Sequence, residues 1–459
     1  MSPRLASLDW IVGLAPAWPA LTALLIAAWL ATGRAPSERV VSSVATTGLG
    51  ATLLSIVVAT GRWVTSGFTP QVVDFGALSS AEDGTRLLFV FDGKSLPVAL
   101  TAAVLLLATS RFSSNYLHRE PGFVRFFALM LVFGAGLMLL LLGGSLDIVF
   151  AGWELVGMTS VLLVGFFHER TDPVRAAIRV LITYRLCDIG LVFAGLLLYR
   201  AMHTTEFHAL AFVGAGSRWA VTLATAGIVF AIMGKSAQFP LGGWLPRAME
   251  GPTASSAIFY GGLSVHAGVY LLVRVEPLYA DVPALRLFIG AVGAVTAIVA
   301  TLSGQVSPDA KTSLAYATSA QVGIMLVECA AGLPALALVH LVAHTTLRYY
   351  QFLRTPSVLQ AALARRAALG AQGIEDFDRR RWRLLPTPTK LFLYRLAIER
   401  FEVEAVFDRW VGRPVLALSA GVDRFEKRLM GTPAERPTKD APPRSGGAVR
   451  AVSWEDEAP

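Results

Sequence analysis

Apolar runs long enough to cross a lipid bilayer recur along most of this sequence. A transmembrane helix needs about 20 consecutive, mainly apolar residues. Runs of that kind lie near 11–31, 40–61, 87–109, 124–144, 146–167, 177–200, 219–238, 254–274, 284–305, 313–331 and 334–353. The pattern predicts an all-α polytopic membrane protein with about eleven transmembrane helices. The first run has no strongly basic segment before it, so we expect a membrane span there and not a signal peptide.

Composition and charge limit the possible functions. The chain is 54% hydrophobic and 16% charged, which is too apolar for an ordinary soluble protein. Its net charge of +8 comes from Arg residues in short loops and after Leu353, so we expect membrane lipid and no nucleic acid as its surroundings. The two cysteines, Cys187 and Cys329, have no second ligand at metal-binding spacing. We therefore expect no disulfide framework, zinc ribbon or iron–sulfur cluster within this chain. The sequence also has no flavin, quinone, nucleotide or metal motif, so we predict no cofactor site and no enzymatic reaction here, and any chemistry beyond ion movement is expected from a partner.

Arginine-rich loops predict the topology. The positive-inside rule places the basic segment after Leu353 in the cytoplasm and the N-terminus outside. Loops 31–39, 111–123 and 168–176 then fall inside, and the acidic 74–83 stretch falls outside. The predicted location is the inner (cytoplasmic) membrane. The basic residues after Leu353 are Arg354, Arg365, Arg366, Arg379, Arg380, Arg381, Arg383 and Lys390.

Lys235 lies within the seventh apolar run, where a charge at bilayer depth costs at least about 2.5 kcal/mol. Such a residue is paired, faces a polar interior or serves an ion pathway. Glycine and proline residues surround it, which predicts a broken transmembrane helix around Lys235–Pro246 with free backbone groups beside a polar cavity. These residues are Gly234, Pro240, Gly242, Gly243, Pro246, Gly251 and Pro252.

Further titratable residues lie in the other predicted spans, and together they suggest a hydrated file of proton carriers. The proposed carriers are Glu154, Lys235, His266, Lys311, His340 and His344, with Arg185, Asp188, Asp309 and Arg348 as charge partners. His340, His344 and Arg348 are four residues apart in turn, so one helix face carries all three.

Structural explanations remain open for several of these residues. Arg185 and Asp188 are three residues apart and suit a structural ion pair, while Asp309 and Lys311 suit a charge pair in a loop. His340 alone would more often be a satisfied buried histidine. Lys235 and Glu154 have no partner nearby in sequence, so a functional role is favoured for them.

A long motif begins at Gly234: Gly-Lys-Ser-Ala-Gln-Phe-Pro-Leu-Gly-Gly-Trp-Leu-Pro, continuing to residue 257. Supporting motifs lie at 153–157, 184–188, 309–323 and 340–348. Together they resemble the antiporter-like subunits of respiratory complex I and of Mrp sodium/proton antiporters over roughly 85–355. The resemblance implies that Glu154 and Lys235 form the central proton-transfer pair.

Several residues of this sequence differ from those that are usual in that family. Tyr260 stands where His is usual, Arg247 where Asp is usual and Arg348 where Lys is usual, whereas His266 replaces a hydroxyl residue. Arginine does not release its proton in proteins, so Arg348 cannot replace a lysine as a relay. The second broken helix of the longer relatives is not matched after Leu353.

These departures, with the run at 347–357, make the chain similar to the shortened DabB (MpsA-like) subunits of inorganic-carbon uptake systems. That resemblance implies a DabA-like partner with a zinc, carbonic-anhydrase-type site, so we expect zinc in the partner and a hetero-oligomer. It also implies proton or Na⁺ flux that drives CO₂ and bicarbonate accumulation. An antiporter-like subunit of a complex I, hydrogenase or Mrp assembly is the alternative, and a structural membrane anchor is a third possibility.

The predicted organisation has four parts. Residues 1–84 form the first transmembrane helices and an outer loop, and 85–355 form the antiporter-like proton-channel core. Residues 356–430 form amphipathic helices that lie on the membrane face or on a partner, because apolar and charged residues alternate there. Residues 431–459 are rich in Pro, Arg and Ser and form a disordered tail.

Overall fold

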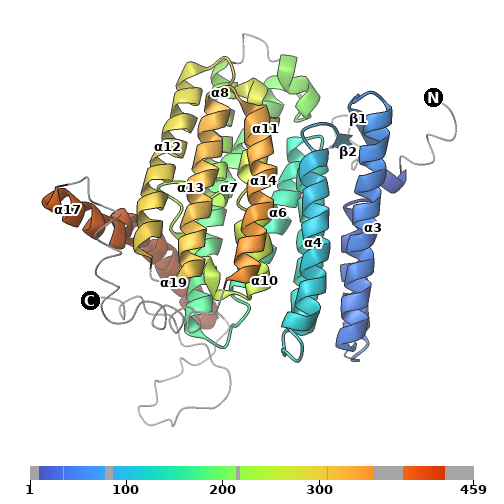
Figure 1. Ribbon diagram of the computed structural model, residues 1–459, viewed down its shortest axis with the longest axis horizontal. Helices are drawn as coiled ribbons and strands as arrows, with labels where there is room; N and C mark the ends of the chain where they lie inside the picture. The colour runs from blue at the N-terminus through green and yellow to red at the C-terminus, as the bar shows by residue number, and fades with distance from the viewer. Residues whose placement is uncertain are drawn as a thin grey trace.

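Long helices run side by side and make up most of the molecule (Figure 1). The computed structural model describes residues 10–34, 36–77, 86–212, 218–307, 309–355 and 386–429. The predicted segment 361–383, its Arg residues and the predicted tail 431–459 lie outside the described residues.

The helices of the bundle follow the predicted apolar runs. They are α2 (Ala17–Ala31), α3 (Glu38–Thr65), α4 (Leu96–Tyr116), α5 (Phe123–Leu142), α6 (Leu146–Val164), α7 (Thr171–Met202), α8 (Arg218–Lys235), the sequence α10 (Thr253–Ser255), η4 (Ser256–Leu263) and α11 (Ala267–Arg274), α12 (Pro283–Val306), α13 (Ala310–Ala330) and α14 (Pro334–Arg354). Short helical pieces connect them: η1 (Phe207–Phe212), α9 (Trp244–Arg247), η3 (Ala248–Glu250) and η5 (Glu276–Leu278).

Eight helices in the described residues are long and apolar enough to cross a membrane. The helix α2 is apolar but has only 15 residues, and α13 and α14 carry polar residues such as Gln321, Glu328 and His340. The all-α class is confirmed, whereas the count of about eleven spans is not. The span Thr253–Arg274 lies at the centre of the bundle, and its apolar length is completely buried. It contains a π-helical segment, η4, over Ser256–Leu263.

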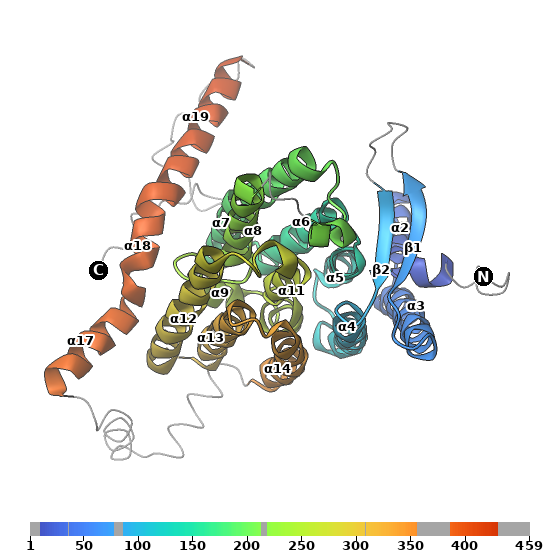
Figure 2. The same cartoon turned by 90° about the horizontal axis from the view of Figure 1, so that it is seen from above.

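A two-stranded hairpin interrupts the helical pattern. Strands β1 (Gln71–Ala77) and β2 (Arg86–Phe91) pair antiparallel, and the backbone N–H of Gly144 donates to the carbonyl of Leu88. Figure 2 shows this hairpin between α3 and the helices α4 and α5. The predicted span at 87–109 is therefore wrong at its start, because 86–91 is a strand and α4 begins at Leu96. Short apolar runs of β-branched and aromatic residues suit a strand as well as a helix.

The C-terminal helices lie along one flank of the bundle, and we call them the C-terminal arm. It consists of α17 (Thr387–Ile398), η6 (Arg400–Glu402), α18 (Val403–Phe407), η7 (Asp408–Gly412) and α19 (Arg413–Leu429). These elements follow one another past the bundle in Figure 2. Apolar side chains such as Trp410, Leu418 and Phe425 are exposed on the arm, consistent with the predicted amphipathic character.

Candidate functional site

The helix break after Lys235 has a specific backbone geometry. Helix α8 ends at Lys235, and Ala237 adopts φ +52°, a left-handed conformation that stops the helix. The indole Nε1 of Trp244 donates to the carbonyl of Gly234 at 2.9 Å. This bond occupies a carbonyl that would otherwise accept from the next helical turn. The predicted broken helix around Lys235–Pro246 is therefore confirmed.

Lys235 is 1% exposed and lies among aromatic rings. Its Nζ donates to the backbone carbonyl of Trp153 at 3.0 Å. The same atom lies 4.3 Å from the ring centroid of Tyr184 and 4.9 Å from that of Trp153. No carboxylate within the described residues lies within 4.0 Å of it. A dipole and two π faces thus surround the amine, and they attract its charged form without an ion pair.

Arg185 joins two carboxylates beside this lysine, Glu154 and Asp188. Its guanidinium forms an ion pair with Glu154 through Nη1, and Nη2 lies 2.9 Å from Asp188 Oδ2. The other oxygen of Asp188 accepts a 2.6 Å hydrogen bond from Trp153 Nε1. The predicted Arg185–Asp188 ion pair is present. Glu154 contacts Arg185 and not Lys235, so the two residues of the expected central pair are linked through Arg185, Asp188 and Trp153.

Three residues from two helices form a second cluster. His266 Nε2 lies 2.9 Å from His344 Nδ1, and Arg348 Nε donates to His344 Nε2 at 3.0 Å. Because a guanidinium only donates, a neutral His344 carries its proton on Nδ1 and donates it to His266. Arg348 thereby sets the direction of this hydrogen bond.

His340 extends this cluster toward α13. Its Nδ1 lies 2.9 Å from Glu328 Oε1, and its Nε2 lies 3.1 Å from Gln321 Oε1. Its ring is perpendicular to that of His344, with centroids 5.9 Å apart. The common face of His340, His344 and Arg348 agrees with the predicted spacing. Glu328 was missed by the sequence reasoning, although an acidic residue within an apolar run was a usable signal.

Asp309 and Lys311 do not form the expected loop pair. Asp309 caps α13 by accepting from the backbone N–H of Thr312 at 2.9 Å. Lys311 Nζ donates to Thr253 Oγ1 at 2.9 Å, at the start of α10. The N-cap bond satisfies a free backbone donor of the helix, which explains why the carboxylate turns toward its own helix.

The structure therefore gathers the predicted residues into separate groups. Lys235, Arg185, Asp188 and Glu154 lie together, and His266, His344, Arg348 and His340 lie together. Lys311 and Asp309 lie apart from both, at the beginning of α13. Among the described residues no hydrogen bond joins Lys235 to His266, and no cluster of three or more His, Cys, Asp or Glu is placed to hold a metal ion.

The family model that matches residues 144–373 is described as NADH:quinone oxidoreductase/Mrp antiporter, transmembrane. The chain is 32% identical over 327 residues to the NADH-quinone oxidoreductase subunit L of Pseudomonas aeruginosa, covering 68% of this chain and 53% of that protein. It spans about half the length of the curated relatives it matches.

Two solved structures share the fold. A chain of the Mrp complex from Dietzia sp. DQ12-45-1b aligns with a TM-score of 0.63 and 23% identity, over 75% of this chain and 37% of that chain. A chain of the membrane-bound sulfane sulfur reductase, an archaeal respiratory membrane complex, aligns with a TM-score of 0.63 and 19% identity, over 87% of both chains.

Proposed function

Because this chain belongs to the NADH:quinone oxidoreductase/Mrp antiporter transmembrane family, we propose that it is a proton-translocating, antiporter-like subunit of a multi-subunit membrane complex. The observation that carries this proposal is the state of Lys235. Its amine is almost completely buried at a helix break, yet it has no direct carboxylate partner in the described part of the chain. A lysine in that setting exchanges its proton more readily than one in an ion pair.

The neighbouring charges supply a mechanism. Arg185 keeps its charge at every physiological pH and contacts both Glu154 and Asp188. Any movement of the guanidinium toward one carboxylate uncovers the other, which changes the field at Lys235. Trp153 transmits this change directly, because its indole binds Asp188 and its carbonyl accepts from Lys235. We propose that this change favours proton uptake in one arrangement and release in the other.

The histidine cluster could continue the proposed proton path beyond Lys235. His344 and His266 share a hydrogen bond, and Glu328 lies beside His340. Water between Lys235 and His266 would connect the two groups of residues. In the proposed orientation the C-terminal arm faces the cytoplasm and the complex lies in the inner membrane, which the distribution of arginine supports.

The assembly that contains this subunit is proposed from the relatives. A respiratory or Mrp-type complex is better supported than inorganic-carbon uptake, because the relatives are named as NAD(P)H-quinone oxidoreductase, NADH-quinone oxidoreductase and Mrp proteins. The inorganic-carbon role rests on the resemblance at 347–357 and on the departures described above. Affinity purification of the tagged chain, with mass spectrometry, separates the two. Quinone-reductase or cation-antiporter subunits support the first role, and a zinc carbonic-anhydrase-type protein supports the second.

Proton flux tests the central proposal. We expect Lys235→Met to reduce flux to background in membrane vesicles that contain the complex, because methionine cannot carry a proton. The matched control is Lys427→Met, since Lys427 is an exposed residue of α19 whose Nζ binds Asp423. Quenching of a pH-sensitive dye measures flux, and immunoblotting confirms equal insertion. Equal flux in both variants at equal insertion would refute the proposal.

A further inference from the structure

The outward sides of helices α13 and α14 form a surface that combines apolar and polar residues. Both helices have 21 residues, which is long enough to cross a bilayer, yet neither is among the eight apolar spans. Figure 2 shows them at the edge of the bundle, between α12 and α4. We call this surface the polar flank. Helical spacing places its residues on one side of each helix, and they are Gln321, Ile324 and Glu328 of α13 and Leu336, Val339 and His340 of α14.

The polar flank exposes apolar side chains around a polar centre. Its three apolar residues are between 38% and 66% exposed, and Val339 is the most exposed of them. Its three polar side chains are partly buried. His340 connects the two helices, because its ring nitrogens lie within hydrogen-bond distance of Glu328 Oε1 and Gln321 Oε1. The polar residues therefore lie together and are not scattered over the surface.

Gln321 is the strongest evidence that a partner covers this surface. It lies near the middle of α13, and its Nε2 has no hydrogen-bond partner among the described residues. Turning the amide over exchanges its nitrogen and oxygen, and the oxygen is then unpaired instead. Glu328 Oε2 also lacks a partner within the described chain. Because hydrocarbon offers no hydrogen bond, lipid is an unfavourable neighbour for these groups.

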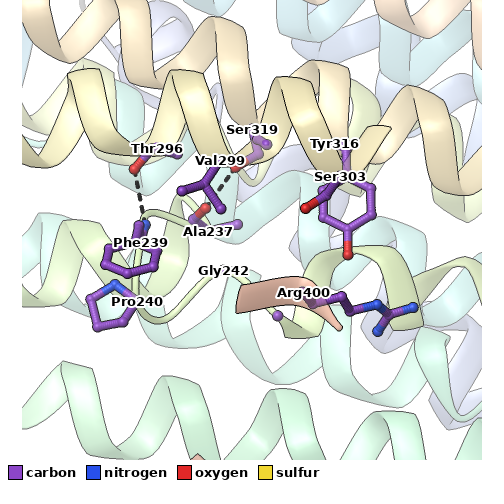
Figure 3. A pocket seen from close by; sticks show the side chains of 12 residues that line it. Ala237, Phe239, Pro240, Gly242, Thr296, Val299, Ser303, Tyr316, Ser319 and Arg400 are labelled. Atoms are coloured by element: carbon purple, nitrogen blue, oxygen red, sulfur yellow. Dashed lines mark hydrogen bonds between the residues drawn. The ribbon is translucent and has the colours of Figure 1, made fainter. Parts of the chain in front are cut away.

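The opposite side of α13 contacts the broken helix. Ser319 Oγ donates to the carbonyl of Ala237 at 2.8 Å, and Thr296 Oγ1 of α12 accepts from the backbone N–H of Phe239 at 2.9 Å (Figure 3). Ser319 and Gln321 are two residues apart, so they point to different sides of α13. Any contact on the polar flank is therefore made with a helix that also holds the break in place.

Two occupants from this chain fit the polar flank poorly. The sequence that follows α14, at 356–385, contains Arg365, Arg366 and Arg379–Arg381, and arginine at bilayer depth is costly. A second copy, related by a two-fold axis along the membrane normal, would bring equivalent residues together near the axis. Glu328 would then face its own equivalent, and two carboxylates repel each other strongly where the dielectric constant is low. A different chain fits better.

We propose that the polar flank binds a membrane-spanning helix of a different subunit, and that this helix places a hydroxyl or amide side chain beside Gln321. Such a side chain both donates and accepts, so it can pair with either end of the Gln321 amide. Close packing of the two chains would cover the apolar residues of the flank. The proposal rests on membership of a multi-subunit complex, and it does not depend on proton transfer at Lys235.

Photo-crosslinking in native membranes identifies what covers the polar flank. The photoreactive residue p-benzoylphenylalanine is placed at Val339 or, for comparison, at Leu54 of α3, which has a similar exposure of 62%. After irradiation, mass spectrometry identifies the attached molecule and the attached residue. We expect position 339 to attach to a membrane-spanning helix of a different subunit, several-fold more than position 54 attaches to that subunit. A product at 339 with lipid, with a second copy or with 356–385 of the same chain would overturn the proposal.

Two substitutions test the same surface through assembly of the complex. We expect Val339→Trp to lower co-purification of that subunit several-fold at equal insertion, because the larger ring blocks its approach, whereas Leu54→Trp should not. Gln321→Leu should also lower it, although leucine would suit a lipid-facing surface better than glutamine. Unchanged co-purification in Val339→Trp and Gln321→Leu would overturn the proposal, even if Lys235→Met abolishes proton flux. Reduced co-purification with normal flux in Lys235→Met would instead remove the proton-transfer proposal and leave the polar flank.

Discussion

Gly157 has no side chain, and the Lys235 amine lies in the space that a side chain there would fill. This glycine is on α6, and a Cβ added to it would lie 2.5 Å from Lys235 Nζ and 3.4 Å from the Tyr184 ring. The first distance is far inside van der Waals contact. The flexible end of the lysine could move away, but it would then lose the carbonyl of Trp153. The absence of a side chain at 157 therefore positions the amine.

We expect Gly157→Ala to lower proton flux several-fold while the protein remains folded, because the methyl group displaces Nζ from its carbonyl partner. Gly50→Ala is the control, since an added Cβ at Gly50 of α3 meets no atom within 4 Å. Alanine in a helix interior is favoured over glycine by about 0.5–1 kcal/mol, so neither variant should lose helix stability. Dye-quenching flux and thermal unfolding are measured on both. Full flux in Gly157→Ala would show that Nζ can work from another position.

Sequence reasoning located the charged residues of the site but not all their partners. The burial of Lys235, the Arg185–Asp188 pair and the shared face of the α14 histidines followed from hydropathy and helical spacing. Trp153, Tyr184 and Glu328 were missed as neighbours because their contacts come from helix packing, which one sequence does not encode locally. The expected Asp309–Lys311 charge pair does not form, because the Asp309 carboxylate accepts an N-cap hydrogen bond from its own helix instead.

At the scale of helices, pairs of glycine residues set how closely neighbouring helices pack. Gly293 of α12 and Gly323 of α13 face each other, and a Cβ on either would lie 2.4 or 2.5 Å from the carbonyl oxygen of the other. Gly190 of α7 and Gly227 of α8 repeat this arrangement at the same distances. Small residues allow such close approach and are typical of helix contacts in membranes. The pairs bring α8 and α12, which flank the helix break, tightly against their neighbours.

Gly293→Leu should therefore lower the free energy of unfolding by about 1–3 kcal/mol, which is the usual cost of overpacking a well-packed contact. Gly61→Leu is the control because Gly61 is exposed on α3 and an added Cβ there meets nothing within 4 Å. Thermal unfolding in detergent can be followed by a thiol-reactive fluorophore, since the native Cys187 and Cys329 are both buried until unfolding. A melting temperature for Gly293→Leu equal to that of Gly61→Leu would contradict this account of the α12–α13 contact.

For individual helices and strands, hydropathy predicted where an element lies better than whether that element is a helix or a strand. Residues 86–91 read as the start of a span but form β2, since an apolar stretch of Leu, Phe and Val suits either structure. The broken helix at Lys235 was predicted correctly because Gly and Pro disfavour a continuous helix by known backbone effects. The π-helical segment η4 had no sequence signal that could have revealed it.

At the scale of the whole molecule, Arg179 links the helix bundle to the C-terminal arm. This residue of α7 is 3% exposed, and its Nη2 lies 2.9 Å from Asp408 Oδ1. The ring centroid of Phe407 lies 5.7 Å from its Cζ. Arg185 and Asp188 are on the same helix, so the arm is attached to the element that carries the charges beside Lys235. The sequence predicted an amphipathic arm but could not show which helices the arm contacts, because Arg179 and Asp408 are far apart in the chain.

We expect Asp408→Ala to loosen the arm from the bundle, because the nearly buried guanidinium of Arg179 loses one of its partners, a carboxylate. Breaking a fully buried pair costs about 3–5 kcal/mol, and the 29% exposure of Asp408 reduces this to about 1–3 kcal/mol. Spin labels at exposed Leu418 of α19 and exposed Leu287 of α12 report the distance between arm and bundle by pulsed electron resonance.

The control for this variant is Asp423→Ala, which removes an exposed pair with Lys427 on α19 worth about 0.3–0.5 kcal/mol. The distance distribution should broaden in Asp408→Ala and stay narrow in the control. A narrow, unshifted distribution in Asp408→Ala would mean that apolar contacts, and not the Arg179 ion pair, hold the arm against the bundle.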